Sequence, residues 1–267
     1  MLIYEHPLSP YAQKVRIALR EKGVPFECRL PRALGAGVAN GLEELTPRFE
    51  TPVLIAEGMR IFDSTIILEY VEERFPEPPL MPAAPIERAR ARMIEEVCDT
   101  HYEAINWALG EIDYFGRGGE ALGPSLRARA IEQIGHIHAW LTRLLSARDW
   151  LNGDQFGWAD MAAAPYVSMS ELFAVAPATP ELAAWLARLK ARPSAAATFA
   201  EARDGLSGLA GAADRLRGGN FKRQFRDHRL EWMIRSGGLQ VVLDGLAQNN
   251  IRFTETDLFL AHSTVQT

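Results

Sequence analysis

Residues 2–23 read LIYEHPLSPYAQKVRIALREKG and carry the strongest structural signals in the chain. The apolar run at residues 2–4 predicts a strand, and Ser9 followed by Pro10 predicts the start of a helix, because proline suits the first helical position. Apolar residues then recur at helical spacing and form the expected buried face: Val15, Ala18 and Leu19. The basic residues around them are expected to face solvent: Lys14, Arg16, Arg20 and Lys22.

Ser9 therefore stands between a strand and the positive N-terminal end of a helix, where an anion is stabilised. Gly23 is expected to end this helix, and a second extended segment starts at residues 24–28. From this segment alone, two interpretations of Ser9 remain open. Its hydroxyl either caps the helix, as serine commonly does, or takes part in chemistry at the helix end.

A second stretch, residues 45–70, reads LTPRFETPVLIAEGMRIFDSTIILEY. It predicts a strand, a hairpin turn containing Gly58, a second strand and a helix beginning at Asp63-Ser64. Four residues of that helix are expected to share one face: Ile66, Ile67, Tyr70 and Val71. A proline that opens a strand cannot donate to the ladder, and a cis Thr51–Pro52 bond would turn the Thr51 backbone outward.

The rest of the chain predicts a helical second half behind a proline-dense linker at residues 73–82. A long helix is expected from residue 85 to about residue 115, and another from residue 125 to about residue 146. The second of these helices has one predicted face: Ile131, Ile134, His138, Leu141 and Leu145. His136 and His138 point in different directions on a helix, so they predict no metal site. A chain of 267 residues is long enough for two domains.

Composition argues against several classes of protein. Cys28 and Cys98 are the two cysteines, and neither lies in a Cys-x-x-Cys pattern, so both are expected to be buried and inert rather than part of a thiol–disulfide mechanism. Without a signal peptide or an apolar run of about twenty residues, a soluble cytoplasmic protein with no membrane partner is expected. A net charge of −5 gives no reason to expect nucleic-acid binding.

The two motifs, in this order and at this separation, resemble the glutathione-binding, thioredoxin-like domain of cytosolic glutathione transferases. Residues 9–23 are similar to the serine-using members, with the tau and zeta classes nearest, and residues 46–76 match the segment with the cis-proline and the later acidic-Ser pair. The resemblance covers roughly residues 1–205 and implies an α/β thioredoxin-like domain at 1–80 and an all-α domain at 86–205. Thr46 and Phe49 depart from the family's Asn and Gly.

The resemblance also implies roles for individual residues. Ser9 would donate its hydroxyl to the sulfur of glutathione and hold it as the thiolate, which is the nucleophilic form. The backbone of Thr51, which precedes Pro52, would pair with the cysteinyl backbone as an added strand does. Ser64 would bind the γ-glutamyl carboxylate and Asp63 the ammonium group, with helix capping by this pair as the alternative.

Tyr11 is expected beside the bound glutathione, and Glu50 receives no role because its carboxylate would oppose the glycyl carboxylate. The electrophile would lie in the cleft between the domains, facing Ser9. Seven residues are candidates for its lining, although aromatic and Met residues more often form the core: Tyr11, His101, Tyr102, Ile105, Trp107, Tyr166 and Met169. In the family a Ser or Thr caps a buried helix of the second domain; here Gly157 takes that place, and Asp160 remains.

Residues 206–267 extend past the usual end of the family and are too apolar for a disordered tail. Residues 239–246 have a helical pattern, and apolar character resumes at residues 251–253. The extension is expected to be a structural appendage of the second domain, a lid over the cleft, or a segment that docks a partner or second subunit.

The resemblance thus implies a glutathione transferase-like enzyme of detoxification, in which the thiolate held by Ser9 attacks a small electrophile by substitution or addition. Glutathione is the co-substrate, no metal or other cofactor is expected, and the resemblance implies a homodimer. Ether cleavage, dehalogenation or isomerisation would use the same thiolate. The alternative from another class is a non-catalytic binding or scaffold protein that uses the C-terminal extension.

Overall fold

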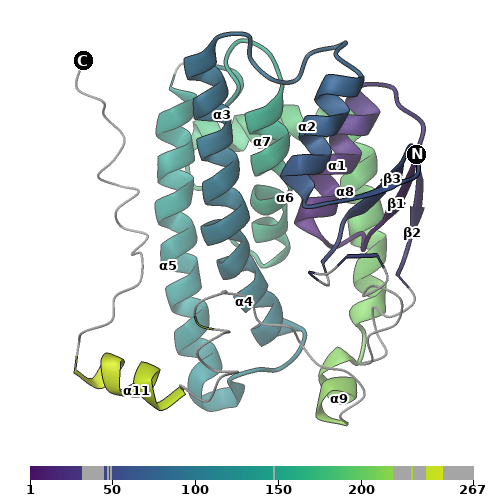
Figure 1. Ribbon diagram of the computed structural model, residues 1–267. Helices are drawn as coiled ribbons and strands as arrows, with labels where there is room; N and C mark the ends of the chain where they lie inside the picture. The colour runs from purple at the N-terminus through teal and green to yellow at the C-terminus, as the bar shows by residue number, and fades with distance from the viewer. Residues whose placement is uncertain are drawn as a thin grey trace.

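A computed structural model describes residues 1–31, 45–46, 48, 50–146, 148–218, 230 and 239–248. Its first part is a four-stranded sheet covered by helices (Figure 1). The elements are β1 (Leu2–Tyr4), α1 (Pro10–Glu21), β2 (Glu27–Arg29), β3 (Val53–Ala56), β4 (Met59–Phe62) and α2 (Ser64–Arg74). β1 pairs in parallel with β2 and antiparallel with β3, and β4 pairs antiparallel with β3, so the order is β2-β1-β3-β4. The predicted hairpin turn at Gly58 is confirmed, because φ is +80° there and β3 and β4 flank it.

The second part is helical (Figure 1). It contains α3 (Pro85–Val97), the π-helical turn η1 (Cys98–Tyr102), α4 (Glu103–Asp113), α5 (Gly119–Leu145), α6 (Trp158–Leu172), α7 (Pro180–Ala191), α8 (Pro193–Gly205), the 3-10 turn η2 (Leu206–Leu209), α9 (Ala212–Arg217) and α11 (Leu239–Ala247). The long helix predicted over residues 85–115 is therefore present, but a π-turn interrupts it. The next helix begins at Gly119, earlier than the predicted residue 125.

α1 joins the two parts, because it packs against α2 of the first part and against α6 and α8 of the second. The prediction that its basic residues face solvent is wrong for three of them, whose side chains are 0–2% exposed: Lys14, Arg16 and Lys22. Arg16 Nη1 lies 2.7 Å from Glu201 Oε2, on α8. Each charge is buried because it meets an acid far away in the sequence, which the helical spacing within α1 does not show.

Three smaller predictions also need correction. In α2 the buried face contains Ile67 and Val71, whereas Ile66 is 54% exposed, and in α5 Ile131 is 43% exposed. Cys98 is buried as predicted, but Cys28 is exposed because β2 is an edge strand. Its thiol is nevertheless partly desolvated beside the Glu5 carboxylate, and both effects raise the pKa of Cys28 to about 12. Cys28 therefore stays a thiol at neutral pH.

Gly157 is the N-cap of the buried helix α6, as predicted, and the helix itself begins at Trp158. The Gly157 amide donates to Asp160 Oδ2 at 3.1 Å, and Asp160 also accepts from Leu151 N and Trp185 Nε1, both at 2.7 Å. The replacement of a hydroxyl residue by glycine has a steric reason, because a Cβ atom at position 157 would overlap the Leu80 carbonyl oxygen and the Asn152 side chain. Asp160 thus ties the start of α6 to the loop before it.

Within the C-terminal extension, the predicted helix at residues 239–246 is confirmed as α11. Three of its leucines are about half exposed: Leu239, Leu243 and Leu246. The predicted apolar character at residues 251–253 lies outside the described residues. Among the residues that the structure describes, no helix is both long and apolar enough to cross a membrane.

Candidate active site

Three loops meet at one edge of the sheet, by which we mean the edge formed by the ends of the strands and not by an outermost strand. Tyr4 of β1 pairs with Val53 of β3, and Val53 pairs with Phe62 of β4. Because β1 and β4 both run antiparallel to β3, the chain leaves β1, enters β3 and leaves β4 at the same edge. This register brings together the loop to Ser9, the Thr51–Pro52 pair and the start of α2, which are the segments that carry the predicted site residues.

Ser9 is the N-cap of α1, and Pro10 is the first helical residue, as predicted. The Ser9 Oγ accepts a hydrogen bond from the Ala12 amide at 3.3 Å, and the side chain is half-buried. Both interpretations of Ser9 remain compatible with this contact, because a serine oxygen that accepts one hydrogen bond can still donate its own hydrogen. The hydroxyl stands at the positive end of a 12-residue helix.

The Thr51–Pro52 peptide bond is cis, in agreement with the sequence reading. Pro52 is buried, Thr51 is half-buried, and β3 begins only at Val53. Thr51 therefore lies just beyond the β1–β3 ladder. An extended ligand at this edge would find the backbone N–H and C=O groups of Thr51 in line with the strand, as in strand addition.

Asp63 is the N-cap of α2 and has a φ of +72°. Its Oδ1 accepts from the amides of Thr65 at 3.0 Å and Ile66 at 3.3 Å, so the capping alternative holds for this residue. Ser64, the first residue of α2, is buried. A left-handed backbone in a non-glycine residue is costly, and such strain is concentrated at functional sites.

Arg48 lies between two carboxylates of this edge. Its Nε is 2.7 Å from Glu50 Oε2, and its Nη1 is 3.4 Å from Asp63 Oδ2. All three side chains are partly exposed. From the sequence, Glu50 receives no role, because its carboxylate would repel the glycyl carboxylate of glutathione. In the structure the Arg48 guanidinium offsets the negative charge of Glu50.

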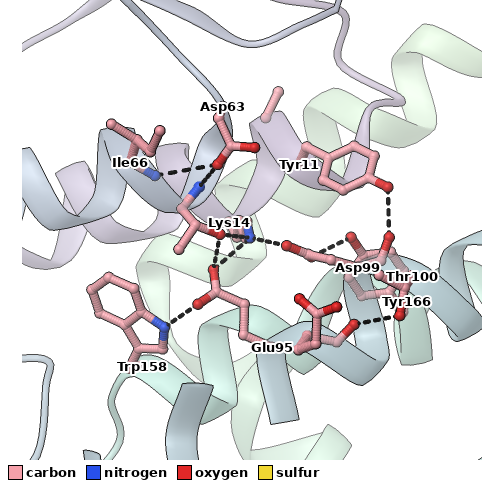
Figure 2. Close-up of polar contacts among 12 residues, drawn as sticks. Tyr11, Lys14, Asp63, Ile66, Glu95, Asp99, Thr100, Trp158 and Tyr166 are labelled. Atoms are coloured by element: carbon pink, nitrogen blue, oxygen red, sulfur yellow. Dashed lines mark hydrogen bonds and ion pairs between the residues drawn. The ribbon is translucent and has the colours of Figure 1, made fainter. Parts of the chain in front are cut away.

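A buried charge cluster lies beside the first turns of α1 and α2 (Figure 2), and the sequence reading missed it. The Lys14 ammonium is 2.6 Å from Glu95 Oε1 on α3 and 2.5 Å from Asp99 Oδ2 on η1. Thr65, which follows Ser64, donates its hydroxyl to Glu95 at 2.9 Å. The available signal was the spacing of the two acids, since residues 95 and 99 are four apart and share one helix face.

Aromatic donors complete this cluster. Trp158 Nε1 donates to Glu95 Oε2 at 2.6 Å, and the Tyr166 hydroxyl donates to Asp99 Oδ1 at 2.7 Å. The Tyr11 hydroxyl donates to the Asp99 backbone carbonyl at 2.7 Å. Tyr11, predicted to lie beside glutathione, thus makes a polar contact with the helical part of the protein.

The electrostatics of the cluster keep Lys14 charged. Burial alone would lower the pKa of Lys14, but the Asp99 and Glu95 carboxylates outweigh it and the pKa is raised. Burial raises the pKa of Asp99, with the Lys14 charge opposing it. Lys14 therefore holds two carboxylates of the helical part against α1.

The structure separates the seven predicted lining residues of the cleft. Tyr102 and Tyr166 have no exposed surface and belong to the core, where the Tyr102 hydroxyl lies 2.5 Å from His138 Nε2 and 2.6 Å from Ser170 Oγ. Ile105 is only 8% exposed. The other four are half-buried: Tyr11, His101, Trp107 and Met169. Burial lowers the pKa of His101, which favours its neutral form. A lining role is therefore unsupported for the two tyrosines, because their rings are enclosed by helices.

In the part of the chain that the structure describes, no group of three or more His, Cys, Asp or Glu side chains is placed to hold a metal ion.

Two family descriptions match the sequence. "Glutathione S-transferase, N-terminal domain" matches residues 3–79, and "Glutathione S-transferase, C-terminal domain" matches residues 125–193. The first match contains the sheet, α1 and α2, and the second contains most of α5 and the helices α6 and α7.

Similar proteins carry different names. A stringent starvation protein A homologue of Haemophilus ducreyi is 30% identical over 62% of this chain and 72% of its own length. FtsZ-localized protein A of Caulobacter vibrioides is 32% identical over 72% of this chain and 87% of its own length. A solved glutathione S-transferase of Methylobacterium radiotolerans, in complex with glutathione sulfonate, is 30% identical to this chain. The two structures superpose with a TM-score of 0.61 over 85% of this chain and 97% of that protein.

Proposed function

This chain belongs to the glutathione S-transferase family, and on that premise we propose that it binds glutathione and uses Ser9 to hold the thiol as a thiolate. The observation that carries the proposal is the convergence of Ser9, Thr51–Pro52 and Asp63-Ser64 at one edge of the sheet. A solved relative that is 30% identical holds glutathione sulfonate, which supports the same class of ligand here.

Each part of the edge suits one part of glutathione. A thiolate beside Ser9 is favoured by a hydrogen bond from the hydroxyl and by the positive end of α1, and both lower the thiol pKa. The Thr51 backbone pairs with the cysteinyl backbone. The start of α2 at Ser64 favours the γ-glutamyl carboxylate, and the Asp63 carboxylate favours the ammonium group.

In the proposed reaction the thiolate attacks an electrophilic carbon of a small molecule, by substitution or addition, as in detoxification. Ether cleavage, dehalogenation and isomerisation use the same first step and remain alternatives within the proposal. Glutathione is the co-substrate, and the reaction as proposed needs no metal or other cofactor. We place the enzyme in the cytoplasm.

Paired variants of Ser9 test the role of its hydroxyl. Ser9→Ala removes the hydroxyl, and we expect turnover with a general electrophile to fall by about ten- to a thousandfold, the scale of losing one stabilising hydrogen bond. Ser9→Thr keeps a hydroxyl at the N-cap and should retain far more activity. Equal activity of the alanine variant and the wild type would remove Ser9 from the mechanism.

We also propose that the protein is a homodimer. A groove of about 460 Å³ runs between α2, α3 and α5, and its lining includes Thr65, Met93 and Trp140. Met93 in this lining and Ile66, which follows Thr65 in the chain, are 64% and 54% exposed, so a second copy would cover apolar surface. Met93→Glu should yield monomers in light scattering, whereas Leu172→Glu, on a different helix, should not. A monomeric wild-type protein would contradict the proposal.

A second candidate is a binding or scaffold protein without catalysis. The observation in its favour is that two similar proteins are named for stringent starvation and for FtsZ localisation rather than as transferases. The half-exposed leucines of α11 offer apolar surface for a partner. Immobilised glutathione separates the two candidates, because a transferase should be retained and eluted by free glutathione, and a scaffold that lost the site should flow through.

A further inference from the structure

The first turn of α1 is fastened to the π-turn η1 at two points (Figure 2). Tyr11 donates its hydroxyl to the Asp99 carbonyl at 2.7 Å, and Lys14 donates to the Asp99 carboxylate at 2.5 Å. Tyr11 and Lys14 are three residues apart, so they lie on the same face of α1. Asp99 thus accepts hydrogen bonds from both side chains, which lie two and five residues after Ser9 in the chain.

The π-turn makes the Asp99 carbonyl available to Tyr11. In an α-helix the Glu103 amide would donate to the carbonyl four residues earlier, which belongs to Asp99. Here the Glu103 amide donates to the Cys98 carbonyl, five residues earlier. Single π-turns inside α-helices are frequent at functional sites. The irregular turn therefore has a specific consequence, which is a hydrogen bond between the two parts of the protein.

Further contacts fix Asp99 in place. Tyr166 donates to its other carboxylate oxygen, and the Tyr166 ring packs edge-on against Tyr11, with 6.3 Å between ring centroids. The side chain of Lys14 is 0% exposed and that of Asp99 is 14% exposed. Separating a buried ammonium from its carboxylates is costly, so the first turn of α1 has little freedom to move relative to η1.

We propose that Asp99 and Tyr11 are positioning residues for Ser9, which fix the first turn of α1 against the helical part and so hold the Ser9 hydroxyl where it meets the glutathione sulfur. This inference rests on the proposed function of Ser9. Asp99 acts through α1 and does not itself touch the sulfur. Reaction rates are sensitive to placement of this kind, because an error of about 1 Å in a catalytic group is costly.

Two matched tyrosine variants test the inference. Tyr11→Phe removes the hydroxyl that joins α1 to the π-turn. Tyr102→Phe removes a hydroxyl from the same π-turn, but from the side that contacts His138 and Ser170 in the core. The readout is the pKa of the bound glutathione thiol, followed by the ultraviolet absorbance of the thiolate, with urea unfolding measured in parallel.

We expect Tyr11→Phe to raise the pKa of the bound thiol by roughly half a unit to one unit, which is about a threefold to tenfold shift in the ionisation equilibrium. Asp99→Asn should raise the same pKa. Tyr102→Phe should lower stability without moving the thiol pKa, because its hydroxyl serves the core. If Tyr11 has only a structural role, Tyr11→Phe and Tyr102→Phe will differ from the wild type in stability but will both keep its thiol pKa. This result would overturn the inference.

A double-mutant cycle separates positioning from direct contact. In a Ser9→Ala background, Tyr11→Phe should cause no further rise in the thiol pKa, because the group being positioned is absent. The full rise in that background would overturn the inference, since Tyr11 would then act on the sulfur without Ser9. If wild-type protein binds glutathione without lowering its thiol pKa, the proposed function fails and the inference fails with it; a lowered wild-type pKa that neither Tyr11→Phe nor Asp99→Asn changes refutes the inference alone.

Discussion

Replacing Lys14 with methionine should destabilise the protein strongly. The side chains of Lys14, Glu95 and Asp99 are 0%, 3% and 14% exposed, and the ammonium lies within 2.6 Å of both carboxylates. Methionine keeps most of the length and removes the charge, which leaves two buried acids without their cation. Removing one partner of a buried ion pair costs about 3–5 kcal/mol of the free energy of unfolding, and we expect a loss in this range.

Lys190→Met is the matched control. Lys190 also forms an ion pair, with Glu171, but the two side chains are 40% and 30% exposed. Exposed pairs contribute about 0–1 kcal/mol, because water and salt screen them. Urea unfolding of the two variants and the wild type at pH 7 measures both losses. A Lys14→Met variant as stable as Lys190→Met would refute the assignment of Lys14 as the cation that holds α1 to the helical part.

The same variant should show a characteristic pH dependence. Burial already raises the pKa of Asp99, and without Lys14 no ammonium charge opposes this effect, so the pKa of Asp99 in the folded variant lies further above that in the unfolded chain. The folded form then takes up protons first as the pH falls, so the stability gap between Lys14→Met and wild type should narrow from pH 7 to pH 5. A gap that widens over this range would contradict the account.

Three further predictions concern the ligand, the cysteines and the core. Ser64→Ala should weaken glutathione binding by about 1–3 kcal/mol in calorimetry, because a hydrogen bond to a charged carboxylate is lost, and unchanged affinity would exclude Ser64. Cys28→Ser combined with Cys98→Ser should keep the turnover of the wild type, whereas abolition would point to a cysteine mechanism. Burial lowers the pKa of His138 from 6.5 to about 4, so the unfolded chain binds this proton first and the stability from neutral His138 is lost as the pH falls from about 6.5 to about 4. Urea unfolding at pH 7 and pH 5 should therefore show a larger loss for wild type than for His138→Gln, and equal losses would contradict the assignment.

Local signals in the sequence predicted the edge of the sheet that carries the site. Ser9-Pro10 marks the start of α1, Asp63 marks the start of α2, and the proline at residue 52 marks the entry to β3. Gly157 was also placed correctly, because Asp160 three residues later completes its cap. Each of these features depends on residues within about four positions of one another, where backbone propensity and capping decide the conformation.

The buried charges could not be predicted in the same way. Lys14 meets acids at positions 95 and 99, and Arg16 meets Glu201, so their partners are set by the packing of α1 against α3, η1 and α8. Tyrosine is common both in pockets and in cores, so the sequence alone does not tell which environment Tyr102 occupies. Its contacts with His138 and Ser170 in the structure place it in the core. The π-turn η1 is not marked by the signals discussed above, which are helical periodicity, capping residues and proline.

The pKa of the glutathione thiol, measured when glutathione is bound to wild type and to Ser9→Ala, decides whether Ser9 holds the thiolate. We expect a value in the wild-type protein well below that of free glutathione, with a rise toward the free value in Ser9→Ala, since the hydroxyl and the start of α1 favour the thiolate. Absence of a thiolate signal at saturating glutathione, or the same lowered pKa in both proteins, would contradict this expectation.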